Sequence, residues 1–227
     1  MFRPFSIYVG LRYTAAKRSN NFISFISLVS MLGLMLGVAA LIVVLSVMNG
    51  FDRELKDRIL GMVPHGTISD YGQPLQNWQA IAAQVDKQAG VVGSAPYIQA
   101  QGMLTNRGVV RGVMINGIDP EFERKISILD DHMKAGSLDQ LQPKEYGIIL
   151  GALLARSMGV AVGDKITLVL PEASISVAGV IPRLKRFTVV GLFEVGAELD
   201  ASLAYIHISD AARIKRMPDG VDGLRLQ

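Results

Sequence analysis

Few side chains in this sequence stand at spacings that would support catalysis. The three histidines, His65, His132 and His207, are scattered along the chain and form no metal-ligand pattern. Asp130 and Asp131 beside His132 would attract a cation, yet such a run is more typical of a solvated loop. The chain has no cysteine, no phosphate-binding G-x-x-x-x-G-K-S/T motif, and no G-x-S-x-G or H-E-x-x-H motif. We therefore expect a non-catalytic protein that holds no cofactor or metal itself.

A basic cluster is the most suggestive feature for binding, and its members are Arg183, Lys185 and Arg186. It closes a fifteen-residue connection, 171–185, between two predicted strands, and hairpin connections are usually much shorter. The connection is apolar and bracketed by prolines; its notable residues are Pro171, Ile175, Val177, Val180, Ile181 and Pro182. We predict a projecting β-hairpin hook with a basic collar that docks another protein. A segment folded back onto its own domain is the alternative.

The hook must be held by a folded domain, which we expect over residues 65–227. Strand-like and helix-like segments are mixed there without a regular βαβ alternation, which indicates an α+β fold. A turn at Asn106–Gly108 predicts a hairpin, and Ser209 is the expected cap of a late helix. The predicted strands are 65–70, 91–95, 97–104, 109–118, 147–150, 165–170, 186–193 and 204–208, and the predicted helices are 77–88, 151–158 and 209–216.

The segment before this domain is long and apolar. No charged residue occurs from Ser19 to Phe51, and the apolar part, 22–48, is long enough to span a bilayer. We therefore predict a cytoplasmic basic or interfacial segment at 1–21, a transmembrane helix at 22–48 and an extracytoplasmic stalk at 49–64, ended by Pro64. A cleaved signal peptide is disfavoured, because the apolar run is too long and lacks a cleavage site.

Charge asymmetry sets the expected orientation. Four basic residues precede the first acidic one, Asp52, and Lys and Arg total 23 against 20 acids. The positive flank places the N-terminus in the cytoplasm. Without these four the rest of the chain carries one more acid than base, so we expect no nucleic-acid binding.

The predicted spanning helix has one face of small residues and, we expect, one face of bulky residues. Ser30, Gly33, Gly37 and Ala40 recur at helical spacing and would allow close packing against another helix, although glycine is common in such segments. We expect a bulky opposite face that meets lipid or an acyl chain, with plain lipid contact the simpler alternative. Its members are Leu36, Val43, Val44, Val47 and Met48. In the stalk an apolar stripe continues through Phe51, Leu55, Ile59 and Met62.

Several sequence runs together resemble a known family. They are Gly10-Leu-Arg-Tyr13, Leu45-Ser-Val-Met-Asn-Gly-Phe51, Ile59-Leu-Gly-Met-Val-Pro64, Gly147-Ile-Ile-Leu-Gly151, Gly163-Asp-Lys-Ile166 and Phe187-Thr-Val-Val-Gly191. In this order they resemble the lipoprotein-releasing (Lol) permease subunits of Gram-negative bacteria, of the hook-bearing LolC or LolF type. The Gly163-Asp164 run alone is typical of the wider group of permeases with a MacB-like periplasmic domain, which includes FtsX-like proteins.

This resemblance implies an inner-membrane subunit of an ABC transporter that passes triacylated lipoproteins to a periplasmic LolA-like chaperone. The implied partners are a second permease subunit, identical or LolE-like, and a cytoplasmic LolD-like ATPase dimer that holds ATP and Mg. The resemblance assigns an acyl-chain cavity or partner-helix contact to Ala40, Val44, Val47, Met48, Phe51, Leu55 and Ile59. It assigns the chaperone-binding hook to 171–182 and its collar to Arg183, Lys185 and Arg186.

Family members continue with three further spanning helices, whereas this sequence stops at Gln227, so we expect a fragment. Three other functions stay open at this point. A MacB-like export permease predicts a short hairpin at 171–185. An FtsX-like scaffold would transmit the state of an ATPase to periplasmic hydrolases. A single-pass anchored enzyme is disfavoured, because the sequence shows no catalytic constellation.

Overall fold

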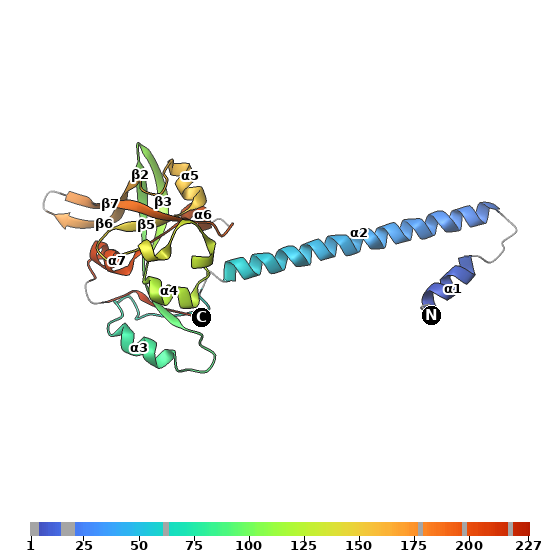
Figure 1. Cartoon of the computed structure of the whole chain (residues 1–227), viewed down its shortest axis with the longest axis horizontal. Coiled ribbons are helices and arrows are strands. Elements are labelled where there is room, and N and C mark those ends of the chain that lie inside the picture. The colour runs from blue at the N-terminus through green and yellow to red at the C-terminus, as the bar shows by residue number, and fades with distance from the viewer. Residues whose placement is uncertain (1–4, 15–20, 61–63, 177–178, 197–198, 218–219) are drawn as a thin grey trace. The chain divides into compact units, whose positions relative to one another are not determined.

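The computed structural model describes residues 5–14, 21–60, 64–176, 179–196, 199–217 and 220–227 (Figure 1). Two compact units make up the chain, Met1–Glu54 and Leu55–Gln227. The first unit contains α1 (Phe5–Thr14) and most of α2 (Asn21–Leu60). The second contains the end of α2 and a folded domain of strands and short helices.

One continuous helix accounts for both the predicted spanning segment and most of the predicted stalk. α2 has 40 residues, which corresponds to about 60 Å at 1.5 Å per residue. Its stretch Phe25–Arg53 is long and apolar enough to cross a membrane. Residues 61–63 lie outside the described part, so the end of the stalk at Pro64 stays a prediction.

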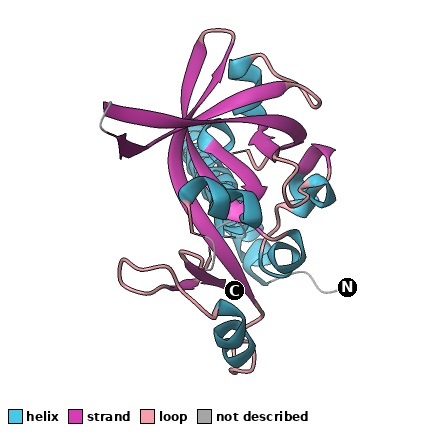
Figure 2. Ribbon diagram, turned by 90° about the vertical axis from the view of Figure 1, so that its left-hand side faces the viewer, coloured by secondary structure: helices cyan, strands magenta, loops and turns pink. Residues whose placement is uncertain are grey.

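Nine strands form the framework of the domain (Figure 2). They are β1 (Gly66–Ile68), β2 (Ser94–Asn106), β3 (Val109–Ile118), β4 (Met133–Gly136), β5 (Gly147–Gly151), β6 (Lys165–Ser176), β7 (Gly179–Phe193), β8 (Leu203–His207) and β9 (Gly223–Leu226). The pairs β3–β8 and β5–β7 are parallel and the other pairs antiparallel. The α+β class expected from the sequence is confirmed.

A closed ring of strands lies within this sheet. The pairing path runs β2–β3–β8–β5–β7, and β6 pairs with both β7 and β2, so these six strands close on themselves. Alternate residues point into the ring, because strand side chains alternate between faces. The inward side chains include Leu104, Ile115, Ile148, Leu168 and Phe187, each at most 1% exposed. The ring is therefore a packed core and gives the domain its rigidity.

Short helices cover the ends and outer faces of the ring. They are α3 (Trp78–Val85), α4 (Pro120–Ile126), α5 (Ala152–Met158), α6 (Leu199–Ser202) and α7 (Ile208–Lys215), with 3-10 turns at Asp130–His132 and Leu138–Gln140. Leu154 and Met158 of α5 and Ala211 of α7 join the core inside the ring. A second core packs outside it, where Leu129 and Leu138 meet Phe193 and Tyr205.

Most predicted elements are present, with four corrections. The predicted strands around Pro96 are one strand, β2, since pairing with β3 begins only at Tyr97 and proline interrupts no bond on that side. The cap of α7 is His207, whose Nδ1 accepts the Ser209 N–H at 3.1 Å, rather than Ser209. The strands β4 and β9, of four residues each, were missed. The connection 171–185 is built mostly of strand.

Candidate functional site

The predicted hook is an extension of β6 and β7 beyond the ring. The two strands pair from Lys165–Thr188 to Leu170–Arg183, and then again from Ser174–Ile181 to Ser176–Gly179. Between these ladders the register shifts, at the positions of the two prolines, which cannot donate to a ladder. In Figures 1 and 2 the far ends of β6 and β7 extend beyond the rest of the domain. The sequence prediction of a projecting hairpin therefore agrees with the backbone.

The side chains of residues 172–182 lie outside the described part, including those of Ile175, Val180, Ile181 and Pro182, and so does Val177 entirely. Pro171 is exposed. The register shows that both arms pair with each other there, and no other described strand pairs with them. The distal hairpin is thus a two-stranded ribbon, while the root of the hairpin, 165–170 with 183–188, belongs to the closed ring.

The basic collar divides between two faces of β7. Arg183 lies opposite Leu170 and Lys185 opposite Leu168, so both share the inner face with the core. Arg186 lies opposite Thr167 on the outer face, where its side chain is exposed. Strand alternation therefore places Arg186 on the opposite face from Arg183 and Lys185, although the three residues lie close together in the sequence.

The two inner cations bind the domain itself. Arg183 donates from Nη1 to the backbone oxygen of Ile214, in the last turn of α7, at 2.7 Å. Lys185 Nζ lies 3.5 Å from the centre of the Tyr146 ring, in cation–π geometry. A hydrogen bond with Arg213 and the nearby Lys185 lower the pKa of the Tyr146 hydroxyl. These contacts fix the root of the hairpin against α7 and Tyr146.

A buried carboxylate holds Tyr146 in place. Asp210 of α7 is fully buried and accepts the backbone N–H groups of Lys144 at 3.0 Å and Tyr146 at 3.1 Å. Both residues have positive φ, 71° and 54°, a conformation uncommon for residues other than glycine. The buried hydrogen bonds stabilise this turn and so fix the position of the Tyr146 ring that Lys185 contacts.

An apolar row crosses the outer face of the same root. Met103 of β2 lies opposite Val169 of β6, which lies opposite Leu184 of β7. Met103 is 41% exposed and Leu184 is 64% exposed. Together with Arg186 they form what we call the outer root face, which consists of Met103, Val169, Leu184 and Arg186. Sequence reasoning missed Met103 and Leu184, although the alternation of Arg183 to Arg186 was a usable signal.

The spanning helix presents one stripe rather than two opposite faces. At about 100° per residue, Leu36, Val44, Val47 and Met48 point within about 60° of Gly33 and so share its side of α2. The prediction of a bulky face opposite the glycines is therefore wrong for these four residues. Small residues occupy the stripe at Ser30, Gly33, Gly37 and Ala40, and larger ones follow at Val44, Val47, Met48 and Phe51.

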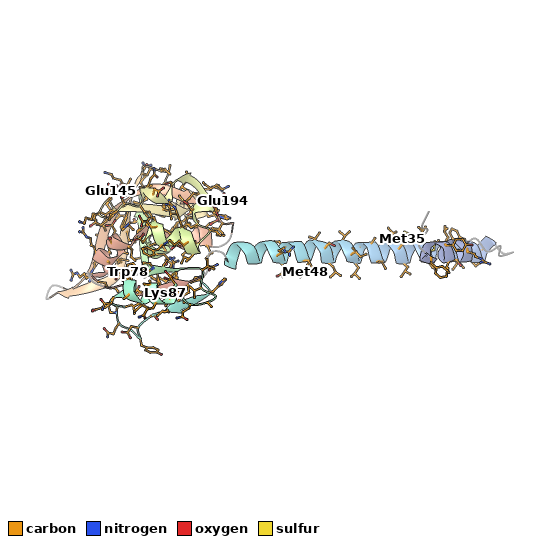
Figure 3. All side chains as sticks on the ribbon, turned by 60° about the horizontal axis from the view of Figure 1, so that its bottom comes forward. Met35, Met48, Trp78, Lys87, Glu145 and Glu194 are labelled. Carbon is orange, nitrogen blue, oxygen red and sulfur yellow. The ribbon has the colours of Figure 1, made fainter. Side chains whose placement is uncertain are left out.

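The side chains of this stripe that the structure describes are exposed. A Cβ atom added to Gly33 or Gly37 would meet nothing within 4 Å. Val44 is 61% exposed and Phe51 64% exposed, and Met48 extends freely from the helix in Figure 3. Leu55 and Ile59 belong to α2, but their side chains lie outside the described part. The stripe is free to meet lipid, an acyl chain or another helix.

The histidines have structural contacts where they are buried. His132 Nδ1 lies 2.9 Å from the backbone oxygen of Ile128, and His207 caps α7. Asp130 pairs with Arg124 at 3.0 Å, rather than joining His132 around a cation. Across the described residues no group of three histidine or acidic side chains is placed to hold a metal.

Comparison with known proteins decides the family. The sequence profile of the MacB-like periplasmic core domain matches residues 27–225. This chain belongs to that family. The chain is also 46% identical, over 228 residues, to the lipoprotein-releasing system transmembrane protein LolC of Xylella fastidiosa, covering 100% of this chain and 55% of that protein.

Two further relatives carry the same kind of name. LolC of Neisseria meningitidis is 46% identical over 97% of this chain and 53% of its own length. LolE of Haemophilus influenzae is 29% identical over 97% of this chain and 54% of its length. The resemblance to Lol permease subunits is thereby confirmed, and the chain spans about half the length of these relatives.

Solved structures give weaker likenesses. The periplasmic region of MacB from Actinobacillus actinomycetemcomitans has 13% identity and a TM-score of 0.47, covering 67% of this chain and 65% of that one. The extracellular domain of the Gram-positive transporter YknZ has 11% identity and a TM-score of 0.47, covering 69% and 75%. Scores of this size establish nothing by themselves, so the family assignment rests on sequence.

Proposed function

We propose that this chain works in a permease subunit of an ABC transporter that extracts triacylated lipoproteins from the inner membrane and passes them to a periplasmic chaperone. The supporting observation is the 46% identity to LolC proteins, which extends over α2, the ring and the hairpin alike. The N-terminus would be cytoplasmic and the domain periplasmic, as the basic flank favours. A second permease subunit, identical or LolE-like, and a LolD-like ATPase dimer would complete the transporter.

The stripe on α2 fits a role at a lipid cavity. Small residues at its N-terminal part would let another spanning helix approach closely. Larger residues, from Val44 to Phe51, would hold the neighbouring helices further apart at that level and leave apolar room for acyl chains. Exposing a chain to water costs about 0.8 kcal/mol per CH₂, so three acyl chains need an apolar path out of the bilayer. This stripe is where we propose that path begins.

The distal hairpin and the outer root face would dock the chaperone. Residues 171–176 and 179–182 extend past the ring, and the outer root face adds exposed Leu184 and Arg186 beside them. Of the predicted collar, we assign chaperone contact to Arg186. Arg183 and Lys185 instead hold the root, since their charged groups are engaged with Ile214 and Tyr146.

The alternatives have less support. An export permease was expected to have a short hairpin, whereas β6 and β7 continue to Ser176 and Gly179. A cell-division-type scaffold would share the MacB-like domain, but the similar proteins are named as lipoprotein-releasing. An anchored enzyme has no supporting constellation among the described residues.

Site-specific photo-crosslinking in the assembled transporter tests this function. A photo-reactive amino acid at Ile175 or at Arg186 should give an adduct with the LolA-like chaperone. The matched control is position Arg107, at the tip of the β2–β3 hairpin, which should give none. Replacing 172–181 by a two-residue Asn-Gly turn should stop lipoprotein release and leave ATPase activity measurable.

Three results would contradict the proposal. Full lipoprotein release by the shortened hairpin would remove the hairpin from the transfer step. Equal adducts from Arg107 and Ile175 would mean that the chaperone has no preferred docking site on the domain. Co-purification of peptidoglycan hydrolases, with no bound lipoprotein, would favour the scaffold function instead.

A further inference from the structure

A cavity of about 960 Å³ lies along α7, next to the turn that carries Tyr146. Residues of α3, of α7 and of the segments around Asp119, Lys144 and Gly220 line it. We call it the α7 groove. Its volume is within the range of ligand sites in proteins, and nothing in the proposed lipoprotein transfer uses it.

The groove carries an excess of positive charge. Lys144, Arg213 and Arg216 line it, and Asp119 is the one carboxylate among its described lining residues. Asp119 is already engaged, because its Oδ1 accepts the Glu121 N–H at 3.0 Å as the cap of α4. Within the described part of the chain, none of the three cations has a carboxylate at ion-pair distance. Such a surface would gain free energy by binding an anion.

Backbone dipoles add to this charge. The first residues of α3, Asn77 and Trp78, line the groove, and the side chain of Asn77 does not cap the helix. Uncapped N–H groups at a helix start attract negative charge. His207 also lines the groove, and burial lowers the pKa of its ring, which disfavours a further positive charge there.

Three residues of the groove have an unusual backbone conformation. Asn77, Lys144 and Arg216 have φ of 53°, 71° and 59°, where glycine would normally be favoured. Two of these three positions, Lys144 and Arg216, carry cations and line the same cavity. Backbone strain of this kind concentrates at functional sites, where side chains must be presented in a fixed direction.

The shape of the groove selects among anions. α7 has eight residues and is about 12 Å long. The lining of the groove includes apolar Ile208 and Ala212 between Lys144 at one end and Arg216 at the other. Trp78 adds an aromatic wall, and Figure 3 labels it at the start of α3. An extended peptide places alternate side chains about 7 Å apart, which fits charged ends with an apolar centre. A single phosphate or lipid headgroup would occupy only one end.

We propose that the α7 groove binds a short, extended acidic peptide segment of another protein, with carboxylates at Lys144 and Arg216 and an apolar side chain against Trp78. This goes beyond lipoprotein transfer at the hairpin and would be a second protein-binding site on the domain. The fluorescence of Trp78 can report binding directly, because it is the only tryptophan in the chain.

The test uses the whole chain in non-ionic detergent micelles, titrated with a blocked peptide in which every second residue is in turn aspartate, leucine and aspartate, so that these three side chains lie on one face of the extended peptide. We expect a saturable change in Trp78 emission that weakens as salt is raised. The double variant Lys144→Gly, Arg216→Gly should raise the dissociation constant about fivefold or more. Glycine suits both backbone positions, so this variant should fold at least as well. Arg213 is left intact because it also bonds Tyr146.

The control variant is Arg107→Gly, which removes a cation at a positive-φ position outside the groove and should leave the dissociation constant unchanged. An equal response to the same peptide with asparagine in place of each aspartate would overturn the proposal, since charge would then play no part. A response to inorganic phosphate, or to phosphatidylglycerol in mixed micelles, that matches the peptide would overturn the assignment to a peptide. The absence of any emission change would overturn the site itself.

Discussion

The two faces of the hairpin root are made by alternate residues of the same two strands, and they have different roles. On the inner face Ile166, Leu168 and Phe187 are at most 1% exposed and form part of the ring core. On the outer face, one residue away in each strand, Leu184 is 64% exposed and Arg186 is exposed. One strand pair thus holds the domain together and also presents a surface.

This difference explains how a projecting hairpin can be rigid at its base. The inner face is fixed by the core and by two cations, since Arg183 binds the end of α7 and Lys185 binds Tyr146. The outer face needs no contact within the domain for the root to be stable. It can therefore vary with its partner, and mutations on the two faces should separate stability from docking.

The strongest test of the comparison removes a leucine from each face. Leu168→Ala should lower the free energy of unfolding by about 2–5 kcal/mol, because it leaves a cavity in a core that is 1% exposed at this residue. Leu184→Ala, the same substitution on the outer face, should change it by about 0.5 kcal/mol or less. Urea denaturation of the whole chain in micelles, followed by Trp78 fluorescence, measures both.

A similar loss of stability for the two variants would contradict the comparison. It would mean that the outer root face is covered within the domain. If Leu184→Ala is stable but crosslinks poorly to the chaperone from Ile175, the division of labour between the faces is sharpened.

The two arginines give the next largest contrast. Arg183→Met keeps most of the side-chain length but loses the hydrogen bond to Ile214, which should cost about 1 kcal/mol. The cost is moderated because Arg183 Nε is buried without a partner among the described residues, and the substitution removes that group too. Arg186→Met should leave stability unchanged within about 0.5 kcal/mol. Equal losses of stability in both variants would show that Arg183 and Arg186 contribute equally to holding the hairpin root.

The sequence predicted the elements that have strong local signals. The apolar length of α2, the turn at Asn106–Gly108 and the alternation of β3 are each set by residues near in sequence, and all three are present. Arg107 and Gly108 both have positive φ, as the tight hairpin turn requires. The family was also readable, because its motifs are continuous runs.

Features that depend on distant partners could not be predicted. The closure of the ring rests on β6 pairing with β2, which is about 60 residues away in sequence. The division of the collar follows from the register of β6 against β7, and a shift of one residue would have exchanged the faces. The α7 groove brings together residues from six separate segments, none of which forms a motif alone.

Of the predicted effects, that of acid should be the smallest. Acid should weaken the support of the inner face of the hairpin root and not affect the outer face. α7 supports that face through the Ile214 carbonyl, and its first turn depends on His207 Nδ1 accepting the Ser209 N–H. Only the neutral ring can accept in this way. Burial lowers the pKa of His207 below its usual value, against the opposing effect of Asp119 and Asp210. The folded state therefore binds a proton less readily than the unfolded chain, and its stability falls as the pH drops below the ordinary histidine range.

The matched variant is His207→Asn, because asparagine is a good cap that does not titrate in this range. Between pH 7.5 and 5.5 the natural chain should lose up to about 1 kcal/mol more stability than the variant, which is the size of a helix cap. Comparing the two proteins cancels the opposite trend from Glu123, whose pKa is raised by burial and whose protonation favours folding in acid. Hydrogen exchange should place the acid effect in α7 and the root of β7. An equal pH dependence of the two proteins would show that the cap does not govern the support of the inner face.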